Sequence, residues 1–170
     1  MLHVLKAAEA RLAELLQNEA SWLTVDVDYH PPRVERLWQQ WGEYRISLHR
    51  IHPCRPEEAL FHPHPWPTAM RIVSGVYNMG VGHGPGIDPP PVDKALQMSA
   101  GSVYEMVDRD DWHYVQPVGD VALTVMVSGA PWQREMPIRP PKLNPLKEAQ
   151  KREILDFFRR KYFPESSRRN

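Results

Sequence analysis

Proline restricts the fold of this chain more than any other residue. It accounts for 18 of the 170 residues, whereas soluble proteins usually contain about 5%. Because proline removes a backbone donor and breaks helices, long helices cannot fill the middle of the chain. The length suits one domain, so we expect a single domain over residues 1–170, with one core and short appended segments.

Helical patterns occur only near the two ends. From Leu2 to Leu16 apolar residues recur at helical spacing with charges on the other side, which predicts an amphipathic helix within residues 1–20. Asn144 and Pro145 supply an N-cap and a first-turn proline for a second helix over 145–163. The Pro-Pro step within 25–36 predicts an irregular connection or an edge strand there.

Between these ends, period-two alternation and short apolar runs predict strands. The candidates are 43–52, 69–81, 94–98, 102–108, 112–116 and 121–128. Many short strands separated by glycine- and proline-rich turns are typical of an all-β sandwich or barrel, which we place at 43–136.

The charge balance argues against nucleic acid or an anionic membrane as a partner. Lysine plus arginine and aspartate plus glutamate each number 21, so no overall field attracts a polyanion. No stretch approaches the roughly 18 apolar residues of a membrane span, and the charged N-terminal pattern does not fit a signal peptide. A single cysteine, Cys54, excludes an internal disulfide and suits a reducing compartment, so we expect a cytoplasmic protein.

One pair among the eight histidines has a spacing with chemical use. His62 and His64 flank Pro63 in the segment FHPHPWP. Alternate side chains of an extended segment share a face, so both imidazoles can reach one metal ion. The neighbouring prolines stiffen that extended form. An isolated pair of this kind is weak evidence for a metal site.

The residues that follow make the pair more specific. His62 and His64 are followed by three residues, Thr68, six residues and Gly75. This order resembles the first motif of the cupin superfamily, in which a glutamate stands where Thr68 stands here.

The second cupin motif begins with a glycine and supplies one more histidine about eleven residues later. Here Gly101 leads to His113, and 25 residues separate Gly75 from Gly101. The motif lacks its usual proline and glycine, and its spacing is one residue longer than in the family. This extra residue implies a bulge or a longer turn before His113. The resemblance covers roughly 43–136 and implies a cupin fold, a double-stranded β-helix or jelly-roll barrel, with a helix at each end.

A narrower similarity is to small bacterial cupins of mostly unassigned function. It rests on the runs LHRIHP, FHPHPWP, SGVY, GSVYEMVDRDDWH and TVMVSGAPWQREM. With Thr68 in place of the glutamate, the implied metal ligands are His62, His64 and His113, as in cysteine-dioxygenase-like cupins.

That ligand set implies one divalent metal, with Fe(II) favoured and zinc, nickel or manganese compatible. The leading function is therefore a mononuclear non-haem dioxygenase acting on a small polar metabolite. A metal-dependent isomerase or lyase is an alternative, and so is a non-catalytic binding module, because fold does not determine function. Cupins often dimerise, so a homodimer is possible here.

Further site residues follow from strand parity and hydrogen-bonding capacity. Thr68 is expected to hydrogen-bond a metal-bound water or the substrate. On its strand, Met70 and Ile72 should face inward as an apolar wall. Three polar candidates complete the set: Arg50 for anion recognition, and the hydroxyls of Tyr77 and Tyr114, the last with a catalytic role.

Overall fold

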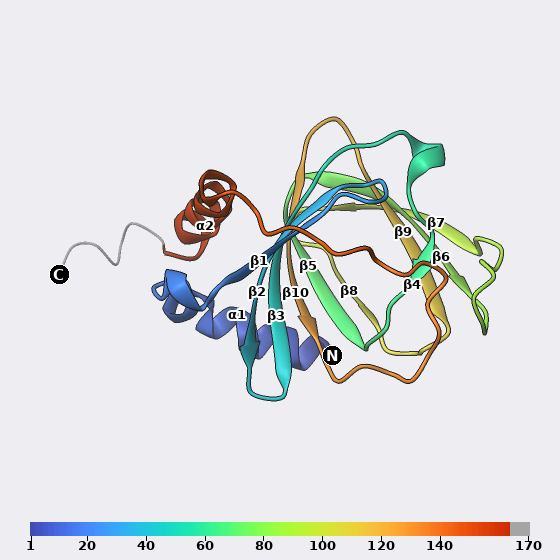
Figure 1. Ribbon diagram of the computed structural model, residues 1–170, viewed down its shortest axis with the longest axis horizontal. Helices are drawn as coiled ribbons and strands as arrows, with labels where there is room; N and C mark the ends of the chain where they lie inside the picture. Colours follow the sequence, from blue (N-terminus) through green and yellow to red (C-terminus); the bar gives the residue numbers. More distant parts are fainter. Residues whose placement is uncertain (164–170) are drawn as a thin grey trace.

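The computed structural model describes residues 1–163 and is mostly β, with a helix at each end (Figure 1). The helices are α1, Leu2–Leu15, and α2, Glu148–Tyr162. The strands are β1 Leu23–Val27, β2 Val34–Trp41, β3 Tyr44–Ile51, β4 His62–Pro63, β5 Thr68–Ser74, β6 Val76–His83, β7 Lys94–Ser99, β8 Val103–Met106, β9 Asp111–Pro117 and β10 Ala122–Ser128. None of the helices within residues 1–163 is long and apolar enough to cross a membrane.

The strands form two antiparallel sheets that face each other as a flattened barrel (Figure 1). The larger sheet has the order β1-β2-β3-β10-β5-β8, and the smaller has the order β4-β9-β6-β7. Several neighbours in the sheets, such as β3 and β10 or β4 and β9, are distant in the chain, as in a jelly roll. The expected all-β jelly-roll barrel with two terminal helices is confirmed.

A glycine divides the stretch 69–81, which the sequence predicts as one strand. Gly75 has a φ of +89°, a left-handed conformation that favours glycine. A Cβ added there would lie 2.8 Å from the Val121 carbonyl oxygen. The chain turns at this point, so that β5 lies in the larger sheet and β6 in the smaller one.

The larger sheet begins before residue 43, where the sequence analysis starts the barrel. The β1–β2 hairpin pairs Leu23 with Trp38 and Val27 with Val34, and β2 then pairs with β3. The predicted irregular segment 25–36 is therefore strand at both ends, and its two prolines lie in the connection, joined by a cis peptide bond.

The C-terminal helix begins at Glu148, three residues later than expected. Asn144 does not cap it, because the Asn144 carbonyl accepts a hydrogen bond of 2.8 Å from the Asp26 amide at the edge of β1. The amide of Lys147 instead donates to Gln150 Oε1 over 3.0 Å, which satisfies one free donor of the first turn. The structure does not describe residues 164–170. The frayed end that the sequence suggests for 165–170 therefore lies outside the described residues.

The larger apolar core lies outside the barrel, between the two helices and the outer face of the six-stranded sheet (Figure 1). Leu5 and Leu12 of α1 and Leu155 and Phe158 of α2 are all buried there against the sheet. The apolar stripe of α1 is thus covered by its own chain. A smaller cluster lies inside the barrel: Ile51, Ile72, Tyr77, Met79, Val115 and Ala122.

After β10 a proline-rich segment, 129–146, crosses the barrel from one sheet toward the other (Figure 1). It is fixed by backbone hydrogen bonds from Gly129 to the Pro67 carbonyl, 3.0 Å, and from Trp132 to the Pro65 carbonyl, 2.7 Å. We call residues 129–146 the strap. It passes close to the segment that carries His62 and His64.

Candidate metal centre

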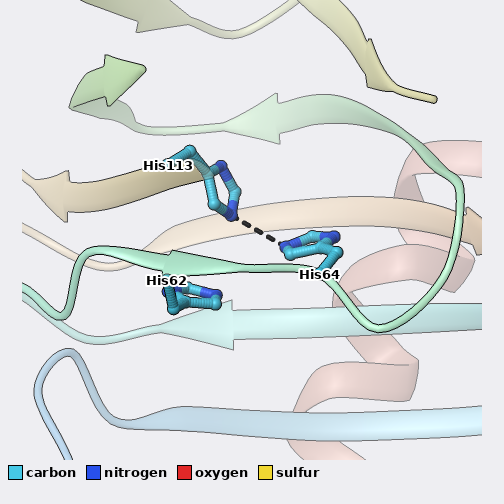
Figure 2. A group of neighbouring side chains, drawn as sticks. All are labelled: His62, His64 and His113. Carbon is cyan, nitrogen blue, oxygen red and sulfur yellow. Dashed lines mark hydrogen bonds between the residues drawn. The ribbon is translucent and has the colours of Figure 1, made fainter. Parts of the chain in front are cut away.

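Three histidines meet on the inner side of the four-stranded sheet (Figure 2). His62 in β4 is the register partner of His113 in β9, and His64 follows two residues after His62. Pro63 separates the pair and keeps the segment extended, so that both rings turn to the same side. One ligand nitrogen from each ring lies within 4.8 Å of the other two.

Hydrogen bonds orient these rings. His62 Nδ1 lies 2.9 Å from the Leu60 carbonyl, which only accepts, so Nδ1 carries the proton and Nε2 keeps a lone pair. His64 Nδ1 lies 3.1 Å from the Thr68 hydroxyl oxygen. His64 Nε2 and His113 Nε2 face each other at 2.8 Å (Figure 2). Nitrogens that ligate metals are commonly held in this way by a partner on the other ring nitrogen.

All three rings are kept neutral by their surroundings. Burial lowers the pKa of His62 to about 4, and its neighbours His30 and Arg36 add to that effect. Burial holds the pKa values of His64 and His113 well below the usual histidine value, and repulsion adds to it, first from His62 for His64 and first from His64 for His113. Neutral imidazoles can bind a metal without first losing a proton.

The donor set fits a divalent ion. His113 Nδ1 is buried without a hydrogen-bond partner among residues 1–163, and the two facing Nε2 atoms cannot both present lone pairs to each other without repulsion. A bound ion would relieve that conflict, because the lone pairs would then face a positive charge. His62, His64 and His113 are the residues that would hold it.

The histidines open onto a cavity of about 400 Å³ between the two sheets. Its walls are mainly apolar, with contributions from both sheets, and the strap closes one side through Met136, Pro137, Ile138, Pro140 and Leu143. An enclosed site with apolar walls and few polar groups is typical of a small-molecule pocket.

Of the expected substrate-binding residues on the inner side, Met70 lines the cavity. Ile72 is completely buried beneath it in the inner cluster. The Tyr77 hydroxyl is also buried there and donates to Tyr104 Oη, 3.2 Å away. Burial raises the pKa of Tyr77 well above its usual value, so this phenol stays protonated. Ile72 and Tyr77 therefore support the floor of the cavity and do not line it.

Arg50 and Tyr114 lie elsewhere, which corrects the expectation that they serve the site. Arg50 faces the outer side of its sheet, where it pairs with the buried Glu35 and, at 2.8 Å, with Glu153 of α2. Tyr114 follows His113 directly, so alternation turns it to the opposite face, against Phe61 and Gly80. The inward residues are their strand neighbours, His49 and His113.

Two residues that sequence reasoning missed line the cavity opposite the histidines: Arg36 and His49. Arg36 Nε donates to His49 Nε2 over 3.0 Å. Both faces of β2 are covered, one by the cavity walls and one by α2, so Val34, Leu37 and Trp38 show no clean alternation that would have revealed the strand. One signal for this strand was available in the sequence. The predicted strand at 43–52 begins directly after the turn at Trp41 and Gly42, as the second strand of a hairpin does.

No protein-family model matches the sequence, and no curated protein matches it. Among solved structures, hydroxypropylphosphonic acid epoxidase from S. wedmorenis matches with a TM-score of 0.52 and 12% identity, over 65% of this chain and 56% of that chain. The chain therefore spans a little over half the length of the epoxidase.

Two further structures match with lower scores. An RmlC-like cupin from Shewanella frigidimarina has a TM-score of 0.45 and 13% identity, over 65% of this chain and 86% of that chain. AerE from Microcystis aeruginosa has a TM-score of 0.47 and 14% identity, over 64% of this chain and 46% of that chain. At these identities the similarity concerns the fold. The chain has a cupin-type barrel fold, as predicted, and its three clustered histidines are able to hold a metal ion.

Proposed function

We propose that this protein is a mononuclear non-haem Fe(II) dioxygenase that acts on a small polar metabolite. The observation that carries the proposal is the convergence of three neutral, oriented imidazoles on a largely apolar cavity between the two sheets. When bound, Fe(II) on three histidines supplies open coordination positions at which a substrate and oxygen can meet. Zinc, nickel and manganese suit the same nitrogen ligands.

The residues of this chain would prepare that chemistry. The Leu60 carbonyl and the Thr68 hydroxyl hold His62 and His64 so that Nε2 of each ring can offer its lone pair to a metal ion. Met70, Met126 and Val115 keep water from the space above the rings, which strengthens electrostatic contacts within it. The strap covers the same space from the outside.

A non-catalytic module is less well supported than an enzyme. A barrel interior filled with side chains beside His62 would have favoured such a module, whereas a cavity of about 400 Å³ lies there. An isomerase or lyase would use the same ion only to polarise a carbonyl group, and oxygen uptake separates it from a dioxygenase.

The metal site is tested by metal analysis of the purified protein. We expect about one equivalent of divalent metal in the wild type, and a loss of at least tenfold in metal affinity in His62→Ala and in His113→Ala, because each change removes a ligand. His83→Ala is the matched control, since His83 is 55% exposed and pairs with Asp108 outside the cluster. Unchanged metal content in both cluster variants would exclude the site.

The reaction is tested by oxygen uptake. The Fe(II)-loaded protein is assayed against a panel of small carboxylates that carry a thiol, hydroxyl or keto group. We expect substrate-dependent oxygen consumption that is absent from the zinc-loaded protein, because zinc has no redox chemistry. Turnover of a panel member at equal rates with zinc and without oxygen would instead identify an isomerase or lyase.

A further inference from the structure

An arginine without an acidic partner faces the same cavity as the histidines. Arg36 in β2 is the register partner of His49 in β3, and both line the cavity. None of the ion pairs formed within residues 1–163 includes Arg36. Its only hydrogen bond in this part of the chain runs from Nε to His49 Nε2, so both terminal nitrogens remain free donors.

His49 holds the guanidinium in place without neutralising it. Because Arg36 Nε is always protonated, His49 Nε2 must accept, and His49 Nδ1 therefore carries the proton and donates to Thr124 Oγ1 over 3.0 Å. Burial, with the charge of Arg36 adding to it, holds the pKa of His49 well below its usual value. The row Arg36, His49 and Thr124 runs across three neighbouring strands and fixes the plane of the arginine head.

The acidic residue next to Arg36 in the chain cannot serve as its counter-charge. Glu35 is turned to the outer face of the sheet, where it pairs with Arg50 and His52. Two further titratable groups act on Arg36: Arg45, which repels it and stacks on Trp38 at 4.3 Å, and the phenol of Tyr29, which carries no charge at neutral pH. Burial and this repulsion lower the pKa of Arg36 to about 10, so it is still charged at neutral pH.

Arg36 is half-buried, and a charge partly withdrawn from water without a partner is costly, so proteins usually pair it. Arg36 is close enough to the histidines to lower the pKa values of His62 and His64. Three neutral rings add no negative charge, so the cavity contains a fixed cation and no anion of its own among the residues that line it. A ligand that brings an anionic group would compensate this charge.

We propose that Arg36 is the anion-binding residue of this cavity and that its ligand is a small metabolite with a carboxylate or phosphonate group. The two free nitrogens of the guanidinium match two oxygens of such a group. The other end of the ligand would then lie toward His62, His64 and His113. That second contact rests on the proposed metal function, whereas the contact with Arg36 does not.

The test uses full-length, metal-free protein and a named probe. Sodium malonate is titrated by calorimetry and by thermal shift, with malonamide as its uncharged analogue and sodium chloride at matched ionic strength. We expect malonate to bind and to raise the melting temperature, while malonamide and chloride do neither. In Arg36→Met we expect the malonate affinity to fall at least tenfold, and in Arg36→Lys to be intermediate, because lysine keeps the charge but lacks the paired donors.

Arg11→Met is the matched control, because Arg11 carries the same charge on the exposed surface of α1. Its malonate affinity should equal that of the wild type. Arg36→Met should also fold, since it removes an unpaired half-buried charge, and its melting temperature without ligand should be equal to or above that of the wild type. If Arg36→Met does not fold, the contrast between malonate and malonamide and the Arg36→Lys affinity decide the question.

Metal analysis of the same variants separates this proposal from the metal function. Normal metal affinity with lost malonate binding in Arg36→Met supports the anion site. Unchanged malonate affinity in Arg36→Met, or equal binding of malonate and malonamide to the wild type, overturns it. Unchanged metal content in both His62→Ala and His113→Ala would instead remove the metal function, and the malonate result for Arg36 would still stand.

Discussion

Thr68 stands where many cupins have a metal-binding glutamate. Its hydroxyl contacts His64, one of the three candidate metal ligands. Its hydroxyl oxygen lies 3.1 Å from His64 Nδ1, and the residue is 1% exposed. For His64 Nε2 to ligate an ion it must be unprotonated, and Nδ1 then carries the proton and donates to Thr68. The threonine therefore selects the tautomer that can bind a metal. We assign it this positioning role in preference to contact with the substrate.

Thr68→Val is expected to lower metal affinity by roughly 10 to 100-fold, because a methyl group of similar size replaces the oxygen that holds His64. Competition titration with Zn(II) and a chromophoric chelator measures the change. Thr68→Ser keeps the hydroxyl and should bind zinc nearly as well as the wild type. Equal zinc affinity in the valine and serine variants would contradict this role.

For individual residues, the sequence predicted the histidine cluster well and the other residues of the cavity poorly. The spacing of His62 and His64, together with the resemblance to the two cupin motifs that adds His113, predicted the three as one group, because the motif distances reflect strand register. Arg50 was assigned to the site and Arg36 was not, although the two lie on neighbouring strands. Their placement depends on which face of the sheet is the interior, and a strand covered on both faces does not reveal that in its sequence.

At the scale of elements, the turn at Gly75 determines how the two sheets are joined. The positive φ of Gly75 sends β6 into the smaller sheet, beside the strand that carries His113. Its close neighbours are backbone atoms of Val121 and Ala122, which cannot move aside as a flexible side chain can. A side chain at this position would therefore strain the junction between the sheets.

Gly75→Ala is expected to lower the free energy of unfolding by about 3 kcal/mol, from the left-handed conformation and the backbone clash together. Gly119→Ala is the matched control, because Gly119 also has a positive φ, +79°, but nothing lies within 4 Å of an added Cβ. Its cost should be only about 1 kcal/mol. Urea denaturation measures both, and equal losses would show that the clash at Gly75 contributes nothing.

The elements that were missed share one physical cause. The Pro-Pro step predicted an irregular connection or an edge strand, and β1 is indeed the edge strand of its sheet, but the pairing of β1 with β2 on either side of the prolines was not predicted. Asn144 and Pro145 have the chemistry of a helix start, but a bridge to Asp26 takes Asn144 instead. In both places a partner distant in the chain outweighs the local preference, and local patterns do not contain that partner.

At the scale of the whole molecule, a buried carboxylate joins the C-terminal helix to the barrel. Glu35 is 1% exposed and pairs with Arg50, His52 and Gln150 of α2. Burial by itself raises the pKa of Glu35, but the hydrogen bonds from Arg50 and His52 prevail and lower it from 4.5 to about 2. Glu35 thus stabilises the fold in its charged form.

Because the folded-state pKa of Glu35 lies below its unfolded value of 4.5, its stabilisation is complete above pH 4.5 and is lost as the pH falls toward 2. Glu35→Gln should lower the free energy of unfolding by about 3 kcal/mol at pH 7. The difference between wild type and variant should shrink below pH 4.5. Urea denaturation at pH 7, 4 and 3 measures it, and a difference that does not change with pH would contradict this role.

The apolar core between the helices and the sheet has a consequence for how this protein can diversify. The side chains that hold the molecule together, such as Leu12, Leu48 and Phe158, are separated by the sheet from those that face the cavity, such as Arg36, His49 and Met70. Substitutions that reshape the cavity therefore leave the main source of stability intact. A barrel built in this way can acquire new ligand preferences by a few inward changes, which makes it a suitable scaffold for directed evolution.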